Sequence, residues 1–110
     1  MSGAEVVDVA PARVRVSLPA HLRNLARVAG EVTVDVARPA TLGGVVDALE
    51  ATYPALGGTL RDRASGERRP FVRFYVAQED RSHHPLDAPL PEAVARGEVA
   101  VAIVGAMAGG

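Results

Sequence analysis

The sequence predicts an α+β fold, a roll in which one main helix packs across a mixed sheet of four or five strands. Two observations carry this prediction. Four segments either alternate polar and apolar residues or are β-rich and apolar, as strands are, and one segment spaces its apolar residues as a helix does. The 110 residues suit one domain. We expect a flexible arm over residues 1–12, the folded domain over 13–104 and a flexible tail over 105–110.

Four segments are expected to form the sheet. Polar and apolar residues alternate over 13–18 and 31–36, which a connection with a hydrophobic stripe joins into a hairpin. Residues 71–76 are aromatic and β-branched, and residues 99–104 are apolar throughout. Because a strand without alternation is usually buried on both faces, we expect the last strand in the centre of the sheet, parallel to the first.

The main helix is expected between Thr41, which can cap it, and Pro54, which ends it. Its apolar residues recur at helical spacing, at Leu42, Val45, Val46 and Leu49. Residues 92–96 add a helical turn that Gly97 closes. The order strand, strand, helix, strand, short turn, strand, with a right-handed crossover through the helix, is that of a β-grasp roll.

Composition excludes several classes of function. The chain has 12 basic and 13 acidic residues and a net charge of -1, which argues against a nucleic-acid binder. It has no cysteine, so disulfides and thiolate catalysis are excluded. Its longest apolar run, 99–107, is strand-sized and broken by Gly105, so no membrane span is expected. The acidic N-terminus lacks the layout of a signal peptide, which favours the cytoplasm.

Side-chain chemistry offers few candidate sites. His83 and His84, with Asp87 close by, resemble a metal site, but their spacing matches no standard zinc pattern and a solvated loop is favoured. No phosphate-binding loop or nucleophile elbow occurs. We therefore expect no metal, no catalytic residue and no enzyme acting alone. A local basic patch either docks a partner or, as is favoured, belongs to a solvated loop: Arg61, Arg63, Arg68 and Arg69.

The C-terminal pair Gly109-Gly110 is the strongest functional signal. A terminus without Cβ atoms can enter a narrow channel. The α-carboxylate of Gly110 is ionised at neutral pH and can attack a phosphoryl group. The alternative is a frayed end, which is common in domains. Because this tail follows a strand expected to be buried, we expect its root to be held firmly.

A candidate docking surface comprises Phe71, Tyr75 and Met107. The first two alternate with three other apolar residues of the third strand, so one of the two sets faces away from the helix. An exposed aromatic patch is a mark of a protein–protein site. The alternative is that loops partly cover both faces. Met107 is expected either to anchor the tail in a partner pocket or to be a mobile side chain.

These features resemble the ubiquitin-like sulfur carriers, which include the small subunit of molybdopterin synthase, the thiamine sulfur carrier and relatives that serve cysteine synthesis. The resemblance covers residues 13–110. The region 61–81 looks most like the cysteine-synthesis branch. The matching pieces are 14–19, 22–23, 41–54, 71–76, 79–81, 90–99 and 108–110.

The resemblance implies a carrier that binds no cofactor. A ubiquitin-activating-type adenylyltransferase would take Ala108, Gly109 and Gly110 into its active site and adenylate the Gly110 carboxylate with ATP. Sulfur would then replace AMP, giving a thiocarboxylate that serves a sulfur-acceptor synthase of a cysteine, molybdopterin or thiamine-type pathway. Two alternatives stay open: a ubiquitin-like modifier that joins target lysines, and an interaction module with an inert tail.

Overall fold

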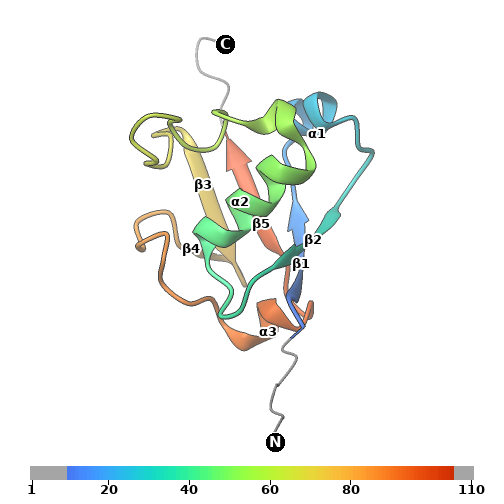
Figure 1. The fold of residues 1–110 in the computed structure, drawn as a ribbon, viewed down its shortest axis with the longest axis vertical. Coiled ribbons are helices and arrows are strands. Elements are labelled where there is room, and N and C mark those ends of the chain that lie inside the picture. The colour runs from blue at the N-terminus through green and yellow to red at the C-terminus, as the bar shows by residue number, and fades with distance from the viewer. Residues whose placement is uncertain (1–9, 106–110) are drawn as a thin grey trace, which may run out of the picture.

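The computed structural model describes residues 10–105 of the chain (Figure 1). Its first and last strands reach Ala12 and Gly105, each one residue beyond the expected limits of the folded domain. The elements are, in chain order, β1 (Ala12–Ser17), α1 (Ala20–Ala26), β2 (Val32–Val36), α2 (Leu42–Thr52), the 3-10 turn η1 (Pro54–Leu56), β3 (Val72–Val76), β4 (Glu79–Asp80), α3 (Glu92–Ala95) and β5 (Val101–Gly105).

The strands form one mixed sheet in the order β2-β1-β5-β3-β4. β1 runs antiparallel to β2 and parallel to β5, and β5 runs antiparallel to β3. The sequence prediction that the last strand lies in the centre, parallel to the first, is confirmed. Figure 1 shows α2 crossing the sheet, with β5 ending at the pole opposite to the start of β1.

The core lies between α2 and one face of the sheet. Residues at every second position of β1, β2 and β3 are buried, and they meet the four apolar residues that α2 turns inward. The predicted cap is present, because the Thr41 hydroxyl accepts a hydrogen bond of 2.9 Å from the N–H of Gly44. The α+β roll with one main helix is therefore confirmed.

The prediction that the last strand is buried on both faces is wrong. Within β5, Val101 and Ile103 are buried, whereas the Val104 side chain is 50% exposed. The helix α2 covers one face of the sheet only, so the side chains that alternate with the buried set reach the other, open face. An apolar strand can thus mark an uncovered apolar surface as well as a central position.

Two elements went unpredicted. The connection 20–30 contains the helix α1, which buries Leu22 and is capped by Arg27, whose φ of 60° is left-handed. The strand β4 follows a turn in which Ala77 and Gln78 also have positive φ values, of 51° and 69°. Neither position has the glycine that usually marks such a conformation, so the sequence did not indicate where α1 ends or that a tight turn follows β3.

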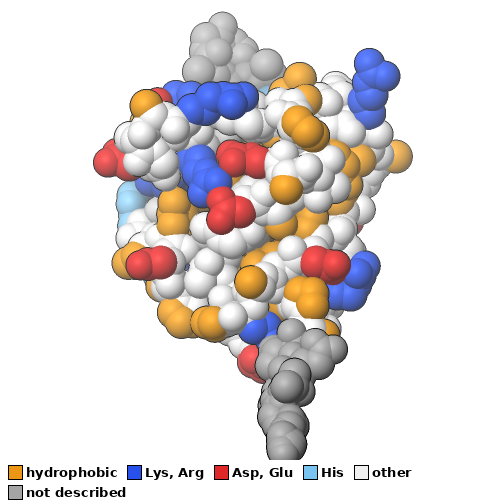
Figure 2. Space-filling model, in the orientation of Figure 1, with side chains coloured by type: hydrophobic (Ala, Val, Ile, Leu, Met, Phe, Trp, Pro, Cys, Tyr) orange, Lys and Arg blue, Asp and Glu red, His pale blue; other side chains and the backbone are white. Residues whose placement is uncertain are grey.

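The arginines of the 61–70 loop hold the loop to the rest of the molecule. Arg61 pairs with Asp47 and Glu50 of α2. Figure 2 shows basic and acidic side chains next to one another on the face of the molecule where α2 lies. Arg68 donates to the carbonyl oxygens of Ser82 and Val72, at 2.8 and 2.7 Å. Arg63 and Arg69 likewise donate to backbone carbonyls. The four arginines are thus engaged within the fold, while residues 63–67 of the loop are exposed, as expected of a solvated loop.

Candidate functional site

The root of the tail is fixed by the sheet. β5 ends at Gly105, which lies opposite Val72 of β3, and β1 pairs with the first half of β5 on the other side. The predicted tail residues Ala108, Gly109 and Gly110, and Met107 of the docking surface, lie outside the described residues. The structure therefore shows where the tail starts and what surrounds that point.

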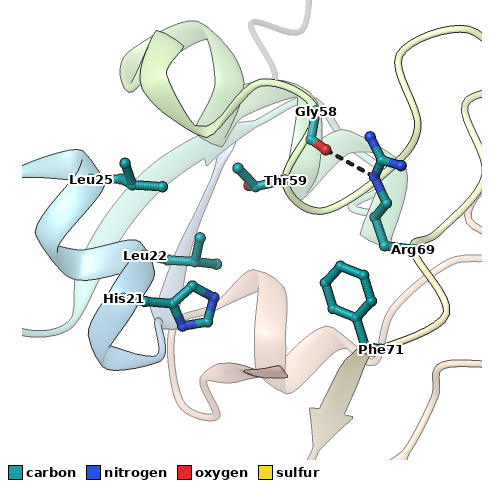
Figure 3. A pocket seen from close by; sticks show the side chains of 7 residues that line it. All are labelled: His21, Leu22, Leu25, Gly58, Thr59, Arg69 and Phe71. Atoms are coloured by element: carbon teal, nitrogen blue, oxygen red, sulfur yellow. Dashed lines mark hydrogen bonds between the residues drawn. The ribbon is translucent and has the colours of Figure 1, made fainter. Parts of the chain in front are cut away.

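A hollow of about 290 Å³ opens beside Gly105, and we call it the tail-root hollow (Figure 3). A Cβ atom added to Gly105 would lie 3.8 Å from both His21 Cε1 and the Phe71 carbonyl oxygen, so the chain leaves β5 at the rim of this hollow. Its lining residues are His21, Leu22, Leu25, Gly58, Thr59, Arg69 and Phe71.

The tail-root hollow is mostly apolar and is held open by defined contacts. Leu22 is buried beneath it, whereas Leu25 and Phe71 are 48% and 39% exposed. Figure 3 shows their side chains across the hollow from each other. The Arg69 guanidinium sits at the rim, where Nε donates to the Gly58 carbonyl at 2.9 Å. Such a hollow suits an apolar side chain and offers no nucleophile.

A second hollow lies on the open face of the sheet, and we call it the open-face hollow. It is larger, about 550 Å³, and its lining is almost wholly apolar. The exposed Val104 belongs to it, together with residues of β3 and of the turn after it. Its lining residues are Tyr75, Ala77, Gln78, Val99, Ala100, Ala102 and Val104.

The rest of the open face is charged. On β1, Arg13 pairs with Asp35 of β2 at 2.9 Å, and Arg15 pairs with Glu31 at 3.0 Å. Arg15 also donates to the Gly97 carbonyl at 2.8 Å. The open face is therefore divided into an apolar half, over β5, Tyr75 and the turn after β3, and a charged half over β1 and β2. Arg73 of β3, which pairs with Asp80 at 3.2 Å, adds a charged edge to the apolar half. This division is typical of a protein–protein contact with an apolar centre and a polar rim.

Hydrogen bonds around Ser82 fix the outer edge of the apolar half. The Ser82 hydroxyl accepts from the Phe74 N–H at 2.9 Å, and the Ser82 N–H donates to Asp80 at 2.8 Å. The hydrogen bonds from the hydroxyl and N–H of Ser82 hold the pKa of Asp80 below its usual value, and Arg73 adds to this effect. The short strand β4 is thus tied to β3 by side chains as well as by its backbone.

The structure places Phe71 and Tyr75 in different hollows. Tyr75 lies within β3 and lines the open-face hollow, whereas Phe71 precedes the strand and lines the tail-root hollow. The alternation used to group them does not extend to Phe71, because β3 begins at Val72. Sequence analysis did not assign His21 or Leu25 of α1 to a site, although Leu25 belongs to the hydrophobic stripe of the 20–30 connection. The three-residue spacing of Leu22 and Leu25 was the available signal for that helix.

No metal cluster and no membrane-crossing helix occur in the described part of the chain. Among residues 10–105, no three side chains of the kinds that bind metal ions come together, and His83 and His84 are exposed. None of the helices in that range is long and apolar enough to cross a membrane.

Comparisons with solved structures decide the family. The crystal structure of CysO from Mycobacterium tuberculosis, described as an antigen, is 32% identical, with a TM-score of 0.65. The alignment covers 86% of this chain and 99% of CysO. The chain belongs to the ubiquitin-like sulfur-carrier and modifier family. The resemblance predicted from the sequence is confirmed. Scans against family models and against curated proteins give no match.

Two further structures agree with this assignment. SAMP1 from Haloferax volcanii, a small archaeal modifier protein, is 26% identical, with a TM-score of 0.69, over 89% of this chain and 99% of SAMP1. CysO in the BexX/CysO complex of Amycolatopsis orientalis shares the fold, at 24% identity and a TM-score of 0.68, over 88% and 99% of the two chains. These members of the family are small carriers or modifiers rather than enzymes.

Proposed function

We propose that this chain is a sulfur carrier whose Gly110 carboxylate is converted to a thiocarboxylate. Membership of the ubiquitin-like sulfur-carrier and modifier family is the observation that carries the proposal. Two features of the chain support it. The strand that leads to the tail is bound on both sides, and the absence of cysteine leaves the terminus as the place for sulfur.

The proposed chemistry has two steps, which occur in a partner enzyme. A carboxylate oxygen of Gly110 attacks the α-phosphorus of ATP and displaces pyrophosphate, giving an acyl adenylate. Hydrosulfide then attacks the carbonyl carbon, and the bond from that carbon to the AMP oxygen breaks. The products are AMP and a thiocarboxylate, and no oxidant or reductant is needed. The carrier contributes the docking surface and the tail, and the partner contributes the catalytic groups.

The apolar half of the open face is the proposed docking surface for the activating enzyme, an adenylyltransferase of the ubiquitin-activating type. Val104 and Tyr75 expose apolar area there, and a contact on this half lies next to the start of the tail. CysO of Amycolatopsis orientalis forms a complex with BexX, which supports a function that depends on a partner. A sulfur-acceptor synthase of a cysteine, molybdopterin or thiamine-type pathway is the second proposed partner. We propose that the exchange occurs in the cytoplasm, where ATP is supplied.

Intact-protein mass spectrometry tests the proposal. The chain is co-expressed with an activating enzyme of this class in cells supplied with sulfide, and we expect one oxygen to be replaced by one sulfur. Oxidation of Met1 or Met107 adds an oxygen and changes the mass almost equally. Fragmentation must therefore place the gain on Gly110.

Two variants give the test its controls. Deleting Gly109 and Gly110 should abolish the mass change. Gly30→Ala should leave it intact, because Gly30 has open space around it and lies in the connection between α1 and β2. If the enzyme loads another carrier in the same cells while this chain stays unchanged, the sulfur-carrier proposal is wrong and an inert tail becomes the better interpretation.

A ubiquitin-like modifier is the second candidate, favoured by the similarity to SAMP1. The activated tail would then form an amide bond with a lysine amine of a target protein, and AMP would leave. All 12 basic residues of this chain are arginine, so it offers no lysine for chains of itself. Adducts between this chain and other proteins in the same experiment, absent from the variant lacking Gly109 and Gly110, would support this function.

A further inference from the structure

We propose that the tail-root hollow is the resting site of the chain's own tail, with the Met107 side chain as its occupant. This inference concerns the free protein and goes beyond the proposed sulfur transfer. It rests on three observations: the exposed apolar side chains around the hollow, the direction in which β5 delivers the chain, and the residues that follow Gly105.

The hollow exposes apolar side chains that a soluble domain normally covers. Leu25, Phe71 and Val104 are the large hydrophobic residues exposed within residues 10–105, and the first two line this one hollow. They come from different parts of the chain, α1 and the segment before β3, yet they face the same space (Figure 3). An apolar side chain placed between Leu25 and Phe71 would bury apolar surface of both residues.

The direction of β5 brings the chain to this hollow. Ile103 faces the core, Val104 faces the open side, and Gly105 lies against His21 on the core side. If the extended conformation of β5 continued past Gly105, alternation would put Met107 on the same side as Gly105. Two extended residues would advance the chain by about 7 Å, so Met107 would stay within reach of a hollow whose rim lies at Gly105.

The composition of the tail leaves one candidate occupant. Beyond Gly105 the sequence is Ala-Met-Ala-Gly-Gly, so Met107 is its only large apolar residue. A methionine side chain is unbranched and adapts to irregular gaps, and its sulfur makes favourable contacts with aromatic rings. Phe71 supplies such a ring at the hollow. The hollow has a volume of about 290 Å³, which accommodates one side chain of this size.

One consequence rests on the proposed function. A tail held by Met107 is not extended for an activating enzyme, so the enzyme must release Met107 before it reaches Gly110. The open-face hollow, on the other side of β5, stays free for docking while the tail is at rest. Docking and tail release would then be separate steps.

Methyl NMR of the free, full-length chain tests the resting site without any partner enzyme. The chain has two methionines, so a sample with ¹³C-labelled methionine methyl groups gives two signals. Met1 precedes β1, which starts at the opposite pole, and serves as the internal reference. We expect the Met107 methyl to show nuclear Overhauser contacts to the Phe71 ring and the Leu25 methyls, and an upfield shift that Met1 lacks.

A matched pair of variants separates this hollow from the other. Leu25→Asp should move the Met107 methyl to the position of an exposed methionine, whereas Val104→Asp should leave it in place. The two residues are exposed to nearly the same extent, 48% and 50%, so both variants make a similar change on the surface. Met107→Ala, a change outside residues 10–105, should shift the Leu25 methyl signals and provides the reciprocal measurement.

Two results would overturn the proposal. In the first, the Met107 methyl signal coincides with that of Met1, shows no contact to Phe71 or Leu25 and does not respond to Leu25→Asp. In the second, Met107→Ala leaves the Leu25 methyl signals unmoved. Neither result depends on sulfur. A chain that accepts no sulfur could still hold its tail in the hollow, and a chain that accepts sulfur could leave the hollow empty.

Discussion

The two sides of β5 lead to two apolar hollows that are built in different ways. The tail-root hollow is formed by side chains of α1 and of the segment 58–71, which meet beside Gly105. The open-face hollow is formed by the sheet itself, through Tyr75 and Val104, and by the turn after β3. One strand therefore serves the core, the start of the tail and an exposed surface, because its side chains alternate between two faces.

The sharpest contrast lies between two neighbours in β5. Ile103→Ala should lower the free energy of unfolding by about 3 kcal/mol, because Ile103 is 3% exposed and its truncation leaves a cavity. Val104→Ala should change it by less than about 0.5 kcal/mol. Urea denaturation of both variants measures the difference. Equal losses of stability would mean that the two faces of β5 do not differ as described.

The open side is expected to matter for docking instead. Val104→Asp should lower the kcat/KM for adenylation by about 30-fold, which corresponds to about 2 kcal/mol, because it places a charge at the centre of the proposed contact. Its urea midpoint should match that of the native chain. Gly30→Ala, in the connection between α1 and β2 and outside both hollows, is the control. A normal rate for Val104→Asp would remove the open-face hollow as the docking site of the activating enzyme.

A substitution in the turn beside the open-face hollow should raise the stability of the fold. Gln78 has a φ of 69°, which costs a residue with a side chain about 1–2 kcal/mol and glycine nothing. Allowing for the greater freedom of glycine in the unfolded chain, Gln78→Gly should raise the free energy of unfolding by about 0.5–1 kcal/mol. The urea midpoint checks this. A lower midpoint would show that the Gln78 side chain stabilises the turn.

A smaller effect should appear in acid. The folded-state pKa of Asp80 is lowered, so its contribution to stability is present above its usual value of 3.8 and is lost as the pH falls through the lower, folded value. Asp80→Asn should therefore be less stable than the native chain at neutral pH and should lose less stability on acidification to about pH 3. Asp62, whose pKa is also lowered, keeps part of the acid dependence in the variant. If Asp80→Asn and the native chain lost equal stability between neutral pH and about pH 3, the stabilising role of the Asp80 carboxylate would be contradicted.

Those parts of the fold that rest on periodicity were predictable. The spacing of apolar residues predicted α2, and Thr41 and Pro54 predicted where it begins and ends. The alternation in β1 and β2 and the apolar last strand gave the order of the central strands. The helix α1 was missed because Pro19 provides no side-chain cap and Arg27, not glycine, takes the left-handed position at its end.

The candidate site was less predictable, because it depends on contacts between distant segments. Periodicity put Phe71 on one face with Tyr75, but the strand begins one residue later, so Phe71 joins α1 at the tail-root hollow. The arginines of the loop looked free in sequence. Their partners, Asp47 and Glu50 on α2 and the backbone of Ser82, are brought near only by the tertiary fold. The terminal Gly109-Gly110 signal needed no tertiary information.

The most direct measurement for the sulfur-carrier proposal uses the absence of cysteine. The purified chain is incubated with an activating enzyme, ATP and sulfide, treated with a thiol-selective fluorescent reagent and separated from the enzyme on a denaturing gel. Because the chain has no cysteine, any label on it reports a terminal thiocarboxylate. We predict labelling that requires ATP and disappears when Gly109 and Gly110 are deleted. An unlabelled chain, in a mixture where the same enzyme labels another carrier, would contradict the proposal.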